Sequence, residues 1–543
     1  MNPSVRGAAL ALTVVVLAGC GADSANNANN AHSADNAHSA DPAAPPAGQS
    51  SQASPRLVSA LPLPENAVEN AVAKLDDMAE DLMAKSGIPG MAVAVVHRGE
   101  TFYAKGFGVK NIKAADEPGN QVDPDTVFQL ASLSKPLGAT VVAHQVGEGA
   151  ITWDTPIVDK LPWFALSDPA VTKMVTVGDM YAHRSGLPDH AGDLLEDLGY
   201  DRRLVLEKLR DFRLDPFRIS YAYTNFGLTA GAEAVASAAN ESWEDLSERV
   251  LYGPLGMSET SSLFGDFVAR ENRAVGHIHA GGKYTPDYVR DPQAQTPAGG
   301  VSSSVSDLSN WLTMLLADGR YEGEQIVAAE ALLPALTPQI VSDRAPEPAG
   351  RSGFYGYGFN VGTTSAARQQ ISHSGAFELG AGTSFLMLPS ADVAIVVLTN
   401  ATPAGVAEAL AAQFADLVQF GEVREDWWSL YSAAFTAMEE PVGSLVGKQP
   451  PADAAPPAPL ASYVGQYAND FWGPARVTDS DGVLQLALGT KLAAPLKHWG
   501  GNVFTFSFVS ENAPPGTISK ATFDGDTLTL EYFDQDGKGT FTR

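Results

Sequence analysis

The chain has 543 residues, of which 45% are hydrophobic and 18% are charged, so it is long enough to form two or more globular domains. Its 63 acidic residues outnumber 35 Lys and Arg and give a net charge of -28, which argues against nucleic-acid binding, because that function needs a basic surface. The single cysteine, Cys20, leaves no intrachain disulfide, Cys-based metal site or catalytic thiol for a folded domain.

The first twenty residues have the form of a secretory signal peptide. Arg6 precedes an apolar run at residues 8–16, which is too short to span a membrane. The ending Leu17-Ala18-Gly19-Cys20 resembles a bacterial lipobox, which implies cleavage before Cys20 and lipidation of that residue. Gly21, in place of aspartate, resembles lipoproteins of the outer membrane, so an envelope protein facing the periplasm is expected. The alternative is an ordinary signal peptide with an incidental cysteine.

A low-complexity segment follows at residues 21–63. It is rich in Asn, Ala, Ser and Pro and contains a nearly exact repeat that includes His32 and His38. Because such a segment has too few apolar groups to fold, it is predicted to be a disordered tether rather than a metal site.

The first ordered elements are predicted from residue 64 onward. Apolar residues recur at helical spacing between residues 68 and 82, and Gly87 is placed to end that helix. Residues 88–96 read as a buried strand, residues 97–100 as a turn and residues 101–106 as the returning strand.

The first chemical signal is Ser132-Leu-Ser-Lys135, at the start of an apolar helix. Positions three apart share a helix face, so Ser132 and Lys135 are expected to point to the same place. A lysine beside a serine hydroxyl can accept or stabilise its proton, which makes the serine a nucleophile. S-x-x-K occurs in β-lactamases and penicillin-binding proteins.

The rest of this domain is predicted to place helices between strands. Residues 140–290 read as mostly helical, with Tyr223-Thr-Asn225 just before a helix at 228–239, and Ser306 is predicted to cap a helix at 308–316. Strands are predicted at 355–359, 370–373, 384–388 and 393–398, followed by a helix at 406–420. This order predicts an α/β (α+β) fold with one antiparallel sheet closed by both termini and a helical insertion.

The C-terminal part has a different pattern. Residues 421–460 contain Trp427 and Trp428 and then a Pro/Ala-rich connector. Residues 461–543 contain short alternating strands at 483–488, 504–508 and 527–532, which predict a small all-β barrel or sandwich.

Two later motifs could complete a serine hydrolase site. Tyr223 could act as general base if neighbouring cations lower its pKa. His373-Ser-Gly375 lies on a predicted strand, and its glycine would let a substrate backbone approach. The G-x-S-x-G elbow of α/β-hydrolases is absent from the sequence, which argues against that class. His277 and His279 have metal-like spacing without a third ligand, so a surface loop is expected there.

The three motifs, in this order, resemble the serine β-lactamase-related family, which includes class C β-lactamases, low-molecular-weight DD-peptidases of the S12 type and related esterases. Flanking segments match too, including Ile88-Pro-Gly90, His183-Arg-Ser-Gly186 and Pro297-Ala-Gly-Gly300. The resemblance covers about residues 65–420 and implies a β-lactamase/transpeptidase-like domain at residues 64–420. Residues 463–543 resemble a β-module often appended to such hydrolases.

The resemblance implies roles for individual residues. Ser132 would be acylated, Lys135 would help to deprotonate it, and Tyr223 would be the base in acylation and the acid toward the leaving group. Asn225 would hold Lys135 and the substrate amide. The backbone N–H groups of Ser132 and Ala376 would form the oxyanion hole, next to Gly375. His373 would bind a substrate carboxylate or tune Tyr223.

His373 separates this chain from class C β-lactamases, which usually have lysine there. A neutral histidine holds an anion less firmly than lysine at pH 7, so efficient β-lactam hydrolysis is not expected. We expect a serine hydrolase that forms an acyl-enzyme on amide bonds, in a peptide with D-residues. The alternatives are a carboxylesterase on the same scaffold and a penicillin-binding sensor that deacylates slowly. No metal or cofactor is implied; the expected partners are a small peptide or ester substrate and, through Cys20, the membrane.

The lipobox yields a direct test. Mass spectrometry of the mature protein from a bacterial host should find a lipid-modified N-terminus at Cys20, because the lipobox directs both cleavage and acylation there. Cys20→Ser should release the protein from the membrane fraction. A mature N-terminus elsewhere, with Cys20 removed or unmodified, would contradict the anchor.

Overall fold

The computed structural model describes residue 59 and residues 61–543. The expected signal peptide, the lipidation site Cys20 and nearly all of the expected tether therefore lie outside the described residues. Among the residues that are described, no helix has the length and apolar character needed to cross a membrane.

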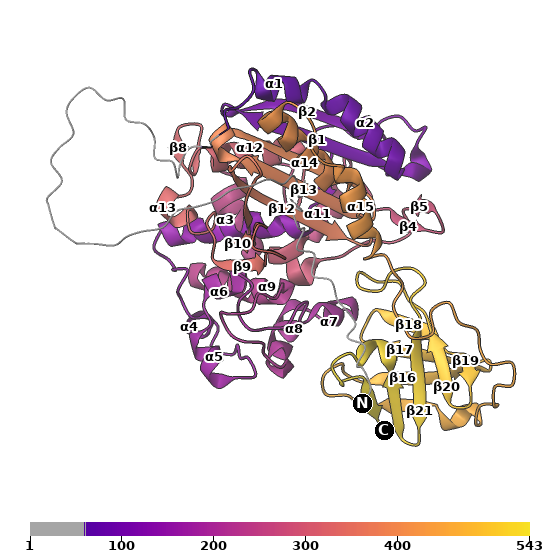
Figure 1. Cartoon of the computed structure of the whole chain (residues 1–543). Helices are drawn as coiled ribbons and strands as arrows, with labels where there is room; N and C mark the ends of the chain where they lie inside the picture. The colour runs from indigo at the N-terminus through magenta and orange to yellow at the C-terminus, as the bar shows by residue number, and fades with distance from the viewer. Residues whose placement is uncertain (1–58, 60) are drawn as a thin grey trace, which may run out of the picture.

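An eight-stranded antiparallel sheet forms the centre of the larger domain (Figure 1). The two ends of the domain meet in it, because β1 pairs with β14 along their whole lengths, from Met91 opposite Thr399 to His97 opposite Val393. This arrangement confirms the predicted fold class. In sheet order, the strands are β2 (Glu100–Gly108), β1 (Gly90–His97), β14 (Val393–Thr399), β13 (Ala381–Leu388), β12 (Gln369–Phe377), β11 (Asn360–Thr363), β10 (Gly353–Tyr355) and β9 (Ile340–Asp343).

Helices cover both faces of this sheet, which explains why β1 is apolar throughout rather than alternating. Val93 and Val95 belong to the core on one face, and Ala92 and Ala94 belong to the core on the other. The first face is covered by α1 (Ala67–Val72), α2 (Leu75–Ser86), α14 (Val406–Phe420) and α15 (Trp427–Thr436). The second is covered by α3 (Ser134–Gly147) and α12 (Val305–Leu316).

A helical subdomain lies beyond the second face, in the magenta part of Figure 1. It supplies α7 and α9, which carry residues of the candidate site. Its helices are α4 (Ile157–Lys160), α5 (Pro169–Met174), α6 (Val177–Tyr181), α7 (Asp193–Asp197), α8 (Arg202–Lys208), α9 (Asn225–Ala239), α10 (Trp243–Ser247) and α11 (Phe264–Ala269). The remaining short elements are α13 (Ala329–Leu332) and the pairs β3 (Phe128–Gln129) with β6 (Ser302–Ser303), β4 (Ile278–Ala280) with β5 (Lys283–Thr285), and β7 (Arg320–Tyr321) with β8 (Glu324–Gln325).

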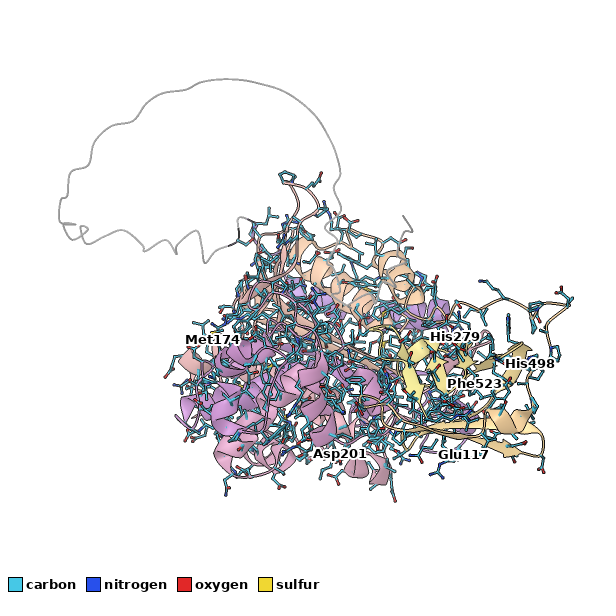
Figure 2. All side chains as sticks on the ribbon, turned by 90° about the horizontal axis from the view of Figure 1, so that it is seen from below. Glu117, Met174, Asp201, His279, His498 and Phe523 are labelled. Carbon is cyan, nitrogen blue, oxygen red and sulfur yellow. The ribbon has the colours of Figure 1, made fainter. Side chains whose placement is uncertain are left out.

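The C-terminal module contains two antiparallel sheets. A bridge between Ala468 and Thr542 joins them, and aromatic side chains such as Phe504 and Phe523 fill its core. Figure 2 labels Met174 at one end of the molecule and His498, in the module, at the other. The strands are β15 (Gly465–Tyr467), β16 (Ala475–Ser480), β17 (Val483–Leu488) and β18 (Leu492–Pro495) in one sheet, and β19 (Lys497–Gly500), β20 (Val503–Phe506), β21 (Ser519–Asp524), β22 (Thr527–Leu530) and β23 (Thr540–Thr542) in the other.

Several predicted boundaries were wrong. The first helix is divided into α1 and α2, although Gly87 ends α2 with a φ of 72°, as predicted. Ser304, not Ser306, caps α12, because its side chain accepts the backbone N–H of Asp307. The predicted strand at 355–359 is interrupted after Tyr355, where Gly356 lies so close to a carbonyl oxygen of another segment that a Cβ would be 2.0 Å from it. Helix α15 was not predicted within the connector.

Candidate active site

Ser132 lies in the short 3₁₀ turn η2 (Ala131–Leu133), directly before α3. Ala131 has a φ of 48°, a left-handed conformation that costs about 1–2 kcal/mol for a residue with a Cβ. Ser134 braces the turn, because its buried hydroxyl donates to the Ala131 carbonyl at 2.7 Å and accepts the Val301 N–H at 3.0 Å. The predicted nucleophile is thus presented on a turn held by Ser134, which is a structural residue.

The ammonium of Lys135 is buried among three oxygen atoms. Its Nζ lies 2.9 Å from Ser132 Oγ, 2.7 Å from Asn225 Oδ1 and 2.9 Å from the Ala298 carbonyl oxygen. The side chain is fully inaccessible to solvent. Burial lowers the pKa of Lys135 to about 7, while the charge of Asp193 acts in the opposite direction. A neutral Lys135 is therefore available near pH 7 to accept the Ser132 proton.

Tyr223 contacts the same hydroxyl. Its phenol oxygen lies 2.8 Å from Ser132 Oγ, and Lys135 Nζ lies 4.5 Å from the centre of its ring. Burial raises the pKa of Tyr223, so the expectation that neighbouring cations lower it was wrong. The physical reason is that desolvation of the phenolate outweighs the hydrogen bond with Ser132, which lowers the pKa of Tyr223, and the negative charge of Asp193 raises that pKa further. In the resting site, Tyr223 is a protonated donor.

His373 has a neutral ring, and both of its ring nitrogens are hydrogen-bonded. Its Nδ1 lies 2.7 Å from the Ser374 carbonyl oxygen, which can only accept, so Nδ1 carries the proton. Nε2, 2.8 Å from the Tyr355 hydroxyl, then accepts from that hydroxyl. Burial, helped by the charge of Lys135, lowers the pKa of His373 to about 3. The geometry leaves neither ring nitrogen to bind a substrate carboxylate, contrary to one of the two expected roles.

Gly375 allows β12 to lie against the turn that carries Ser132. Pairing between β12 and β11 ends at Ser372, and the following part of β12 lies beside η2. A Cβ on Gly375 would lie 2.9 Å from the Ser132 nitrogen and 2.3 Å from the Leu130 carbonyl oxygen. This close approach brings Ala376, one residue further along β12, to the same turn, as an oxyanion hole made of the Ser132 and Ala376 N–H groups requires.

Asp193, at the start of α7, organises the outer side of the site and was not predicted. Its Oδ2 accepts from Asn225 Nδ2 at 2.8 Å and lies 2.8 Å from His190 Nδ1. Burial disfavours charge on His190, but the hydrogen bond to Asp193 and the negative charges of Asp193 and Asp189 together outweigh burial and raise the pKa of His190. Asp189 accepts the backbone N–H of Tyr223. All of these residues follow the His183-Arg-Ser-Gly186 segment, but no spacing in the sequence shows that they face Asn225.

His183 and His277 have structural contacts, and His277 is fully buried, so the expectation of a surface loop there was wrong. His183 Nδ1 accepts the Thr224 N–H at 3.2 Å, and its ring packs 4.5 Å from that of Tyr223. His277 lies between the Ile112 N–H and the Asn400 carbonyl. Within residues 61–543, no group of three or more His, Cys, Asp or Glu side chains is arranged to hold a metal ion.

The close approach at Gly375 can be tested by adding one methyl group. Gly375→Ala should displace β12 from η2, destabilise the domain by about 1–3 kcal/mol, as overpacking does, and slow the reaction of Ser132 with an electrophilic phosphonate probe. Thermal unfolding and the labelling rate measure these effects. Gly362→Ala, on the adjacent strand β11, is the matched control, since nothing lies within 4 Å of its added Cβ. Equal labelling rates for Gly375→Ala and wild type would refute the assigned contact.

Comparison with known proteins agrees with this geometry. The family model described as "Beta-lactamase" matches residues 75–420, and that of a domain of unknown function (DUF3471) matches residues 449–540. The unguisins hydrolase ungD' of Aspergillus campestris (strain IBT 28561) is 26% identical over 407 residues, covering 72% of this chain and 73% of the relative. Penicillin-binding protein 4 of Amycolatopsis lactamdurans is 29% identical over 256 residues, covering 46% and 65%.

A solved structure is similar in fold over most of the chain. The octameric penicillin-binding protein homologue from Pyrococcus abyssi superposes with a TM-score of 0.57 and 20% identity, covering 85% of this chain and 98% of that one. With the "Beta-lactamase" model matching more than half of the sequence, the chain belongs to the beta-lactamase family of serine hydrolases.

Proposed function

We propose that this protein hydrolyses peptide amide bonds through an acyl-enzyme on Ser132. The observation that carries the proposal is the pair of contacts to Ser132 Oγ, from Lys135 Nζ at 2.9 Å and from Tyr223 OH at 2.8 Å. Lys135, whose pKa is lowered, can act as the base for acyl transfer, and Tyr223, whose pKa is raised, can act as the acid. Both contact the same hydroxyl.

The proton transfers follow from these assignments. Neutral Lys135 takes the hydroxyl proton as Ser132 Oγ bonds to the carbonyl carbon. The N–H groups of Ser132 and Ala376 stabilise the negative charge that develops on the carbonyl oxygen. Tyr223 gives its proton to the leaving nitrogen as the C–N bond breaks, and the proton held by Lys135 restores Tyr223. Water then attacks the ester, and its proton returns to Ser132 Oγ.

His373 narrows the substrate class. A buried neutral histidine, engaged by Tyr355 and by its own strand, offers no positive charge to a terminal carboxylate. We therefore favour a peptide whose scissile bond is not followed by a free carboxylate, with a D-residue on the acyl side. The names of two relatives, an unguisins hydrolase and a penicillin-binding protein, support a hydrolase of this family and leave the substrate to be tested.

A carboxylesterase is the second candidate. The same observation on His373 favours it, because an uncharged site would also accept neutral esters. The third candidate, a penicillin-binding sensor, requires that the acyl-enzyme persist.

Substrate profiling separates the three. D-alanyl peptides with an amidated C-terminus should be cleaved at least tenfold faster than the same peptides with a free carboxylate, because no cation at His373 compensates that charge. Ser132→Ala should abolish turnover with the fold intact, and Ser134→Ala should alter stability more than chemistry. If only short acyl esters are turned over, the protein is an esterase and the peptidase proposal is wrong. A stable penicillin adduct without turnover would identify a sensor.

The pH dependence tests Lys135 as the base. The active form is the neutral amine, so acylation should rise with pH through an inflection near 7. The negative charge of Asp193 raises the pKa of Lys135. Asp193→Asn should therefore shift the inflection to lower pH, while its amide oxygen still accepts from Asn225.

Stopped-flow acylation rates between pH 5 and 9 would measure this shift, with Asp201→Asn as control. Asp201 lies at the start of α8, as Asp193 lies at the start of α7, but it is not among the charges that act on Lys135. An inflection that stays in place or moves to higher pH in Asp193→Asn would exclude Lys135 as the titrating base.

A further inference from the structure

A loop of the C-terminal module reaches the end of the strand that carries His373, Gly375 and Ala376. The turn after this strand, between β12 and β13, directs the backbone N–H groups of Glu378 and Leu379 at the carboxylate of Glu511, at 2.9 and 3.5 Å. A carboxylate from a separate domain thus caps the turn that follows the strand of the expected oxyanion hole.

Arg290 connects the same carboxylate to three parts of the site. Its Nε lies 3.6 Å from Glu511, its Nη2 donates to Glu196 on α7, and its guanidinium lies 5.0 Å from the ring of Phe377 on β12. Its backbone carbonyl accepts from Gln129 Nε2 at 2.9 Å, three residues before Ser132. Arg290 is only 4% exposed, so its charge depends on these carboxylates rather than on water.

The module also holds the far end of α7. Asp197 accepts from Ser510 Oγ at 2.7 Å, from the Asn512 N–H at 3.1 Å and from Asn512 Nδ2 at 3.0 Å. Asp193, one turn earlier on α7, accepts a hydrogen bond from Asn225, and Asn225 in turn accepts one from Lys135. Figure 1 shows α7 at the boundary between the larger domain and the yellow strands of the module.

Residues 510–512 of the module therefore bind two elements that each position site residues, the β12–β13 turn and α7. Two other contacts between the domains lie directly after α7 and do not reach the β12–β13 turn. The hydroxyl of Tyr200 donates to the Trp472 carbonyl, and Thr490 bonds to the backbone at residues 198 and 199. These contacts alone would be enough to attach the module to the larger domain.

We propose that the C-terminal module completes the catalytic site, with Glu511 as a positioning residue that holds β12 against the Ser132 turn and, through Arg290 and Glu196, holds α7. This inference rests on the proposed acyl-enzyme chemistry of Ser132. It assigns a role to the matched domain of unknown function: its loop fixes the distance between the nucleophile and the oxyanion donors in the neighbouring domain.

The expected consequence is kinetic. Removal of the Glu511 carboxylate takes away one of the two carboxylates beside Arg290 and leaves the two turn amides without their acceptor, so β12 can move away from η2. A displacement of about 1 Å at an oxyanion donor lowers the rate roughly tenfold to a hundredfold. Substrate binding away from this strand is not altered, so kcat should fall with little change in KM.

The experiment uses the full chain, with Glu511→Ala, Glu511→Gln and the interface control Tyr200→Phe. The readouts are the rate of Ser132 phosphonylation by a fluorophosphonate, kcat and KM on the best substrate, and hydrogen exchange of the Glu378 and Leu379 amides. We expect slower labelling and faster exchange at both amides in Glu511→Ala, an intermediate effect in Glu511→Gln, which keeps one acceptor oxygen, and wild-type values in Tyr200→Phe.

The outcomes distinguish the positioning role of Glu511 from the proposed acyl-enzyme function of Ser132. If wild-type protein is not labelled in a Ser132-dependent manner, the proposed function fails. If wild type is labelled and Glu511→Ala labels at the same rate, the positioning role fails while the proposed function stands. If Glu511→Ala does not fold, Glu511→Gln decides, since it preserves shape; unchanged exchange at Glu378 and Leu379 in that variant would also overturn the inference.

Discussion

The burial of one lysine is the constraint on which the site depends. Lys135 has three hydrogen-bond partners, and they come from three places: the turn that precedes its own helix, the start of α9, and the Ala298 carbonyl in a π-helical turn. Since an amine buried this deeply needs every partner in place, the helical subdomain and the sheet domain must close on each other for Ser132 to be activated. The fold thereby links assembly of the domain to reactivity.

The sequence predicted the part of this site that local spacing encodes. Ser132 and Lys135 point to the same place, Asn225 follows Tyr223 by two residues, and His373 lies on a strand, all as expected, although Ser132 lies in η2 just before the helix that carries Lys135. Asp193, Tyr355 and Ala298 were missed, because their contacts join residues far apart in the chain. The pKa of Tyr223 was misjudged for a related reason: desolvation depends on the surroundings of a side chain, and a motif does not contain them.

His373 shows how the partners of one side chain decide its chemistry. Tyr355, on β10, takes one ring nitrogen, and the histidine's own strand takes the other. The ring is neutral, and the charge of Lys135 disfavours a second positive charge at this position. Burial disfavours the charged form of all three titratable groups, which lowers the pKa of Lys135 and His373 and raises that of Tyr223.

The pairing of β1 with β14 has a consequence for how the protein is made. These neighbours in the middle of the sheet are about three hundred residues apart in sequence, as Met91 opposite Thr399 shows. Closing so long a loop is entropically costly and slow, and it cannot begin until the second partner exists. During synthesis, β1 can pair with β2 early, but its other edge stays unpaired until nearly four hundred residues have emerged.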